Sequence, residues 1–268
     1  MKFIILGLQR SGTTALHAKL LEHREISMCP DEVNARAFFT DGLTALTYGH
    51  FPAKFTEPAR QGLFEAIARL SQPEAQCHGI KTAVGELKLA DDVVRSLRDE
   101  LPSLSIINLE RADYLHRAVS WATASLGSQF HHFLHETERK VPRIWIDPKM
   151  FQVSYFSDQA VKAKFAQLAE SHRYLHLHFE ELQQSPATFF DRVTDFLDVS
   201  PFESKAAVTR KVVKDKDPLA HVVNRQQISR LNQALIDGKI TQAPRVRGKR
   251  FRNKFGRALF RLLNPAHH

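Results

Sequence analysis

The sequence predicts an α/β fold in which a central, mostly parallel sheet of four or five strands is flanked by helices, giving three layers. An apolar run at residues 3–6 is typical of a buried strand and stops at Gly7. A short loop containing a second glycine then leads into the helix-favouring stretch 15–21. This order of strand, glycine loop and helix opens a P-loop-like domain, and further apolar runs and helical periods follow it along the chain.

The later elements are predicted from the same two patterns. Short apolar runs predict strands at 26–29, 76–80, 104–109 and 174–178. Apolar residues at helical spacing predict helices over 57–70, 86–101 and 159–170. In the last strand the alternation places Leu175 and Leu177 on one face and His176 and His178 on the other, so we expect the histidines to form a polar face.

The first loop carries the most specific chemistry. Gly7 and Gly12 stand where a P-loop places its glycines, so N–H groups of the loop and of the first helical turn can converge on an oxyanion. An ATPase has a lysine where this chain has Thr13, and the only cation of the loop is Arg10. The loop therefore favours a nucleotide that lacks a γ-phosphate.

Length and composition indicate one main domain. With 268 residues and 43% hydrophobic content, the chain can bury a full core, and we predict a domain over 1–243 with a helical insertion or acceptor region at about 125–155. The two cysteines, Cys29 and Cys77, are expected to be small core residues. The first strand leaves no room for a signal peptide, and no apolar run approaches the ~20 residues of a membrane span, so we expect a cytoplasmic protein.

The net charge of +9 is concentrated in a predicted C-terminal tail over 244–268. Residues 245–261 include eight basic residues and no acid, whereas the rest of the chain has 30 basic and 29 acidic residues. Apolar residues on one helical face make the tail amphipathic. It could contact the inner membrane face peripherally through 245–263, cover an anionic ligand, or dock on the body with its charges solvated. No motif for stacking bases accompanies the charge, so we expect no nucleic-acid partner.

The loop resembles a known family. The segment Gln9-Arg10-Ser11-Gly12-Thr13-Thr14 is similar to the 5′-phosphosulfate loop of sulfotransferases that use 3′-phosphoadenosine 5′-phosphosulfate (PAPS). The resemblance implies transfer of a sulfuryl group to an acceptor hydroxyl on a carbohydrate, a glycolipid or a small alcohol. Adenosine 3′,5′-bisphosphate (PAP) would be the product, and no metal would be required.

Two further segments extend the resemblance to catalytic residues. A P-x-E segment followed by aromatics places Glu32 where several bacterial and carbohydrate sulfotransferases have the general base, with Asp31 as its neighbour. The dipeptide Lys81-Thr82 resembles the family's K-T pair, whose lysine lies beside the transferring group. Ala83 replaces the histidine or proline that commonly follows, which shifts the assignment of the base to Glu32. Arg10 and Lys81 would stabilise the developing negative charge.

A third segment resembles the family's site for the 3′-phosphate. Arg111 follows a predicted strand and Ser120 lies in the next predicted helix, so a guanidinium and a hydroxyl could converge on a dianionic phosphate. The two residues are nine positions apart, whereas many members have eight. Arg117, one helical turn before Ser120, is the alternative to Arg111.

Three histidines in the predicted insertion have helical spacing that could in principle bind zinc. His131, His132 and His135 are accompanied by no cysteine or further ligand at comparable spacing, so we predict no metal site there. The region more plausibly lines the acceptor pocket or packs as a helical insertion, and the sequence does not choose between these.

Two other functions fit parts of the pattern. A kinase or NTPase with a degenerate P-loop would use Glu110, at a strand end, together with Thr13 or Thr14 to hold magnesium. A non-catalytic protein could keep the fold and use its amphipathic tail on membranes or partners.

Overall fold

A computed structural model of the chain describes residues 1–30, 32–36, 38–39, 63–65, 67–68, 73–85, 87–127, 143–203 and 217–245. The chain divides into two compact units. The first comprises Met1–Ala112 and Ala160–Val208, and the second comprises Asp113–Gln159 and Thr209–His268. The division into a domain over 1–243 and a tail over 244–268 stays a prediction, because 246–268 lie outside the described residues.

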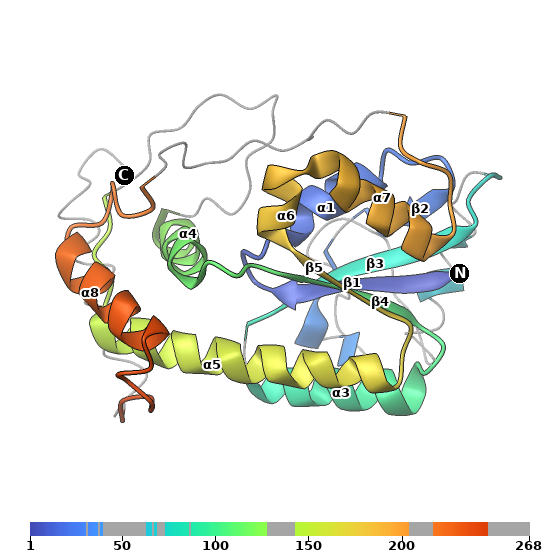
Figure 1. Cartoon of the computed structure of the whole chain (residues 1–268). Helices are drawn as coiled ribbons and strands as arrows, with labels where there is room; N and C mark the ends of the chain where they lie inside the picture. Colours follow the sequence, from blue (N-terminus) through green and yellow to red (C-terminus); the bar gives the residue numbers. More distant parts are fainter. Residues whose placement is uncertain are drawn as a thin grey trace. The chain divides into compact units, whose positions relative to one another are not determined.

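The first unit contains a five-stranded, all-parallel sheet with the strand order β2-β3-β1-β4-β5 (Figure 1). The strands are β1 (Lys2–Leu8), β2 (Ile26–Met28), β3 (Cys77–Val84), β4 (Ser105–Glu110) and β5 (Tyr174–His178). Ile4 of β1 pairs with Ile80 on one side and Ile106 on the other, so β1 is the central strand. The predicted α/β fold with a parallel sheet is confirmed.

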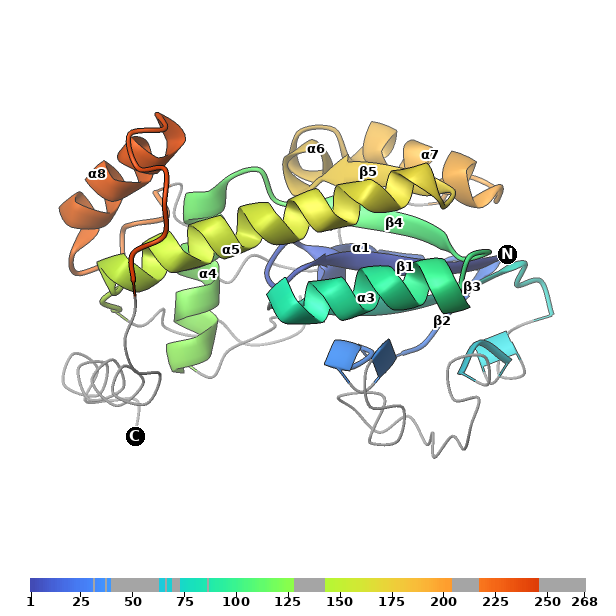
Figure 2. The ribbon, with the colours of Figure 1, turned by 90° about the horizontal axis from the view of Figure 1, so that it is seen from below.

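Helices cover both faces of this sheet (Figures 1 and 2). One face is covered by α1 (Thr13–Leu20), α6 (Phe179–Gln184) and α7 (Pro186–Leu197). The other is covered by α3 (Leu87–Glu100) and the last turns of α5 (Pro148–Ala166), which a short 3-10 helix at Gln167–Glu170 follows.

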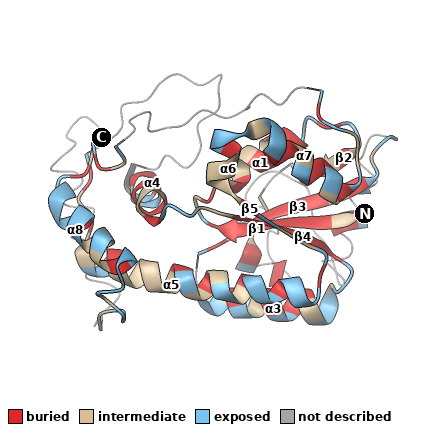
Figure 3. Cartoon of the chain, viewed as in Figure 1, coloured by how far each residue is buried: buried red, intermediate tan, exposed pale blue. Residues whose placement is uncertain are grey.

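Alternation along β1 explains why the sheet has two cores. Phe3 and Ile5 pack with the core on the α1 side, whereas Ile4 and Leu6 pack with the core on the α3 side. All four side chains are fully buried, and β1 is almost entirely buried in Figure 3. A strand buried on both faces reads as a continuous apolar run, which is the pattern found at residues 3–6.

The second unit is built from α4 (Tyr114–Gly127), the first turns of α5 and α8 (Arg225–Ile236). Its core gathers Tyr114, Phe151 and Ile228, and the Tyr114 hydroxyl donates to the Phe151 carbonyl at 2.5 Å. The predicted insertion at about 125–155 is only partly described, because 128–142 lie outside the described residues.

Several boundaries differ from the prediction. The strand predicted at 76–80 continues to Val84, so Lys81 and Thr82 lie within β3 and not after it. The helix predicted from residue 159 begins at Pro148, where Asp147 Oδ1 accepts from the Lys149 N–H at 2.8 Å and acts as an N-terminal cap. Cys29 and Cys77 are both buried thiols, as predicted. None of the helices in the described part of the chain is long and apolar enough to cross a membrane.

Candidate active site

The loop between β1 and α1 has the backbone of an anion cradle. Arg10 and Gly12 both adopt positive φ, at 68° and 96°, and the Ser11 N–H donates to the Leu8 carbonyl at 3.1 Å. Left-handed residues in such a turn direct successive N–H groups toward one point. Gly12 is the cap residue of α1 and offers no side-chain acceptor to the first N–H groups of the helix. Oxygens of a phosphate or sulfonate can accept from these groups instead.

Both loop glycines are required by close packing. A Cβ on Gly7 would lie 2.6 Å from the Leu109 carbonyl oxygen of β4. A Cβ on Gly12 would lie 2.1 Å from Cδ2 of Phe179, the first residue of α6. The glycines therefore let the loop lie against β4 and against the start of α6.

Replacing Gly12 by alanine is expected to destabilise the first unit strongly. The positive φ should cost ~1–3 kcal/mol of unfolding free energy for a residue with a side chain, and the clash with Phe179 a further ~1–3 kcal/mol. Urea unfolding followed by circular dichroism measures the change. Gly238→Ala is the matched control, because Gly238 also has a positive φ, of 68°, but no atom lies within 4 Å of its added Cβ. Equal destabilisation by the two variants would show that Phe179 does not confine the loop.

Three predicted site residues from three separate segments meet beside the loop. The Lys81 ammonium donates to Thr14 Oγ1 at 3.1 Å and forms an ion pair with Glu32 Oε2 at 2.5 Å. The Lys81 side chain is 3% exposed, and that of Glu32 is 22% exposed. The structure therefore brings the first turn of α1, β3 and the Glu32 segment to one point, while Asp31 lies outside the described residues.

Backbone pairing explains how Glu32 is held there. Val33 forms a parallel bridge with Thr82, its N–H donates to the Lys81 carbonyl at 2.8 Å, and its own carbonyl accepts from Thr82 Oγ1 at 2.9 Å. Glu32 is thus anchored along β3, directly beside the lysine with which it pairs.

Two arginines add positive charge to the same region. Burial lowers the pKa of the Arg10 guanidinium, the charge of the nearby Arg111 lowers this pKa further, and the carboxylate of Glu32 acts in the opposite direction. Arg111 follows β4, which is the neighbour of β1, and so reaches the side of the loop. Two guanidiniums that disfavour each other's charge suit a site whose ligand brings several negative charges.

The remaining loop side chains fit an anionic ligand in different ways. Ser11 is fully buried, and among the described residues its Oγ meets no hydrogen-bond partner. A buried hydroxyl of this kind is satisfied when a ligand oxygen accepts from it. Thr13 is buried, whereas Gln9 is exposed and lies beside Gly85 just after β3. The loop thus carries hydroxyl, amide and guanidinium groups that can donate hydrogen bonds to an anion.

Phe179 is a positioning residue that the sequence analysis did not single out. Its ring packs against Gly12 on one side of the loop, and the Arg111 guanidinium lies 5.1 Å from the ring centroid. The Lys162 ammonium of α5 also donates to the Arg111 carbonyl at 3.2 Å. An aromatic directly after β5 was the available signal, but only the packing of α6 against Gly12 shows that it reaches the loop.

Ser120 and Arg117 lie on α4, in the second unit. Ser120 is half-buried. Arg117 is buried in an ion pair with the buried Asp158, and its guanidinium lies 5.6 Å from the Tyr114 ring centroid. The charge of Arg117 is therefore neutralised within its own unit, which favours Arg111 over Arg117 as a ligand for a phosphate.

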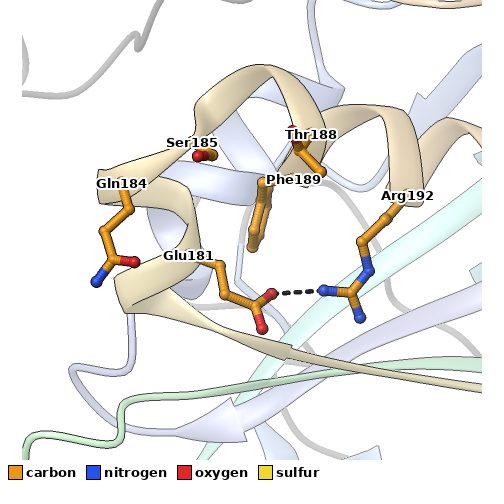
Figure 4. A pocket seen from close by; sticks show the side chains of 6 residues that line it. All are labelled: Glu181, Gln184, Ser185, Thr188, Phe189 and Arg192. Atoms are coloured by element: carbon orange, nitrogen blue, oxygen red, sulfur yellow. Dashed lines mark hydrogen bonds and ion pairs between the residues drawn. The ribbon is translucent and has the colours of Figure 1, made fainter.

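A separate shallow hollow lies between α6 and α7 (Figure 4). The ion pair between Glu181 and Arg192, at 2.6 Å, spans it, and Phe189 supplies apolar lining. None of the predicted site residues lines this hollow.

The geometry of the loop agrees with a comparison against protein families. Residues 3–204 match the model of the sulfotransferase family, which is about three quarters of the chain. The chain belongs to this family. It is accordingly a PAPS-dependent sulfotransferase, and the resemblance seen in residues 9–14 is confirmed.

Two solved bacterial structures show the same fold. A sulfotransferase from Alicyclobacillus acidocaldarius is 16% identical with a TM-score of 0.53, over 88% of this chain and 91% of that one. The sulfotransferase domain of the Synechococcus PCC 7002 olefin synthase is 17% identical with a TM-score of 0.50, over 92% and 90%. Mouse sulfotransferase SULT7A1 complexed with PAP matches with a TM-score of 0.45 at 14% identity, over 88% and 82%. No curated protein sequence matches the chain.

Proposed function

We propose that this sulfotransferase moves the sulfuryl group of PAPS to an acceptor hydroxyl and that Glu32 is its general base. The observation that carries the proposal is the contact of the Lys81 ammonium with both Thr14 Oγ1 and Glu32 Oε2. It places a cation and a carboxylate beside the helix N-terminus that would bind the 5′-phosphosulfate.

The proposed step is an in-line displacement at sulfur. The acceptor oxygen forms a bond to sulfur, the bond between sulfur and the 5′-phosphate oxygen breaks, and the hydroxyl proton passes to Glu32. Glu32 Oε2 is bound by Lys81, so Oε1 is the oxygen that would take this proton. Lys81 and Arg10 would stabilise negative charge on the sulfonate and on the leaving phosphate. PAP is the product, and the proposed step requires no metal.

Arg111 and Ser120 are the proposed ligands of the 3′-phosphate. Support for Arg111 comes from its place beside the loop, where its charge influences Arg10. A guanidinium binds two phosphate oxygens at once, which a lysine in its place would not do. Ser120 is carried over from the sequence motif.

The acceptor class, the cytoplasmic location and the role of the tail are proposals of the same kind. We propose a hydroxyl of a carbohydrate, a glycolipid or a small alcohol as acceptor. The basic tail over 244–268 would keep the enzyme near an anionic surface, where residues 245–263 supply the charge.

The glutamate required by the NTPase alternative is already occupied. The carboxylate of Glu110 pairs with the Lys162 ammonium at 3.2 Å and with His176 Nε2 at 3.3 Å. Its side chain lies on the sheet face covered by α3 and α5, opposite the face covered by α1, because it follows Ile106 and Asn108 in the alternation of β4. This arrangement does not favour a magnesium site between Glu110 and the threonines of α1.

Calorimetric titration of the full chain with PAP tests the donor site, with ATP and magnesium in parallel. Arg10→Ala and Ser120→Ala should each weaken PAP binding about 10- to 100-fold, since each removes a hydrogen bond to a charged phosphate, worth ~1.5–3 kcal/mol. Arg95→Ala and Ser125→Ala are matched controls, because both side chains are exposed on helices and neither is among the residues proposed to bind PAP. Tighter binding of ATP with magnesium than of PAP would contradict the proposal.

A further inference from the structure

We propose that Glu110, His176 and His178 form a binding site for a divalent metal of the zinc class. The site lies on the sheet face covered by α3 and α5, apart from the loop that would bind PAPS. It rests on none of the residues assigned to sulfuryl transfer, so it stands independently of the proposed function.

Strand register brings the three residues together. His176 and His178 are two positions apart on β5, so their side chains leave the same face of the sheet. Glu110 is paired directly with His178 across the parallel ladder between β4 and β5, and its side chain leaves that face as well. This convergence follows from the backbone and does not depend on one choice of side-chain rotamer.

The donor atoms are close enough for one ion. A carboxylate oxygen of Glu110 and a ring nitrogen from each histidine all lie within 4.8 Å of one another. His176 Nε2 and Glu110 Oε1 are 3.3 Å apart, which is about the ~3.3 Å edge of a tetrahedron with ~2.0 Å metal–ligand bonds. The rings of His176 and His178 have centroids 4.6 Å apart. Rotation of the His178 side chain about its χ angles would bring its ring nitrogen toward the same ion.

The donor set is chemically selective. Two imidazoles and one carboxylate are the ligands of several zinc enzymes and suit borderline transition metals, whereas Mg²⁺ and Ca²⁺ prefer oxygen donors alone. Three protein ligands leave a fourth position for water. The His176 side chain is 43% exposed, so an ion can enter from solvent.

One donor has no use within the described part of the chain. His178 Nδ1 is buried and meets no hydrogen-bond partner among the described residues. An unsatisfied buried nitrogen costs ~1–3 kcal/mol, and metal ligation through this atom would remove that cost.

The surroundings of Glu110 match those of a metal-binding carboxylate. Lys162 Nζ lies 3.2 Å from Oε2, and Asn108 Nδ2 donates to Oε1 at 3.3 Å. Outer partners of this kind hold a ligating carboxylate in one orientation. Lys162 contacts Oε2 of Glu110, whereas His176 pairs with Oε1. Oε1 can therefore bind a metal ion while Oε2 keeps its contact with Lys162.

The test uses the untagged full chain and Zn²⁺ alone, followed by calorimetry and by metal analysis after dialysis. We expect one equivalent of Zn²⁺ to bind, Mg²⁺ to give no signal at this site, and Co²⁺ to give the visible absorption of a four-coordinate ion. His176→Ala and His178→Ala should each weaken Zn²⁺ binding at least tenfold. Glu110→Gln, whose side chain has nearly the same shape as glutamate, should weaken it to a similar degree.

His116→Ala is the matched control, because His116 also pairs with a carboxylate, that of Asp113 at 2.6 Å, and is partly exposed on α4. Its Zn²⁺ affinity should equal that of the unmodified chain. Absence of Zn²⁺ binding would overturn the proposal. So would Zn²⁺ binding that survives the combined replacement of His176 and His178, because the ion would then be held elsewhere, for example by His131, His132 and His135. Circular dichroism of each variant would test whether the fold is kept.

Discussion

Replacing Glu32 by glutamine is expected to lower kcat by a factor of ~10²–10⁴, the usual contribution of a positioned general base. The amide has nearly the same shape as the carboxylate but cannot take the proton of the acceptor hydroxyl. PAP affinity should not fall, because Glu32 is a negatively charged group near Arg10 and has no donor to offer a phosphate. The measurement is release of PAP from PAPS with an acceptor that supports turnover by the unmodified enzyme.

Two further variants test whether the loss of kcat is specific to the carboxylate of Glu32. Glu32→Asp keeps a carboxylate but draws it back by one methylene, so its kcat should fall between that of Glu32→Gln and that of the unmodified enzyme. Glu22→Gln removes a carboxylate that also pairs with a buried lysine, Lys19, at 2.6 Å, and should leave kcat unchanged. Full activity of Glu32→Gln would assign the base to another group.

Local sequence patterns predicted the bounds of elements whose own residues mark where they begin and end. The strand Tyr174–His178 has the predicted bounds, because strict alternation of apolar and polar residues marks it. The start of α5 was missed although Asp147 and Pro148 form a helix-start signal, since the surrounding residues 125–155 were interpreted as an insertion.

The extent of β3 required tertiary information. A lysine in an apolar run is a reason to end a strand, and the prediction stopped at Ile80. In the structure Lys81 is buried within β3, because Glu32 and Thr14 satisfy its charge and its hydrogen bonds. A buried charge is stable only with such partners, and they come from distant parts of the sequence.

The sequence also predicted only part of the candidate site. The loop and Lys81 were predicted from short motifs, whereas the contacts that hold them were not. Phe179 reaches Gly12 because β5 is followed at once by α6, and Glu110 meets the histidines because β4 and β5 are neighbours. Both contacts join segments that are far apart in the sequence, and the periodicity of single segments carries no information about which segments meet.

Replacing Lys81 by methionine is expected to lower kcat by a factor of ~10²–10³, the usual effect of removing one group that stabilises developing negative charge. Methionine keeps most of the apolar stem but has no cation for the sulfonate and no donor for Thr14. PAP has no sulfonate, so its affinity, measured by calorimetry, should change far less than kcat. Steady-state rates with PAPS give the comparison.

Lys19→Met separates this catalytic effect from the general cost of losing a buried ammonium. The side chains of Lys19 and Lys81 are both 3% exposed, and each pairs with a glutamate, but Lys19 contacts none of the proposed site residues in the described hydrogen bonds and ion pairs. Both variants should be less stable to urea, because each leaves a carboxylate without its partner. Only Lys81→Met should lose turnover under conditions where both are folded. If the two variants lost turnover equally, Lys81 would be important for stability alone, and the charge beside the transferring group would have to come from Arg10.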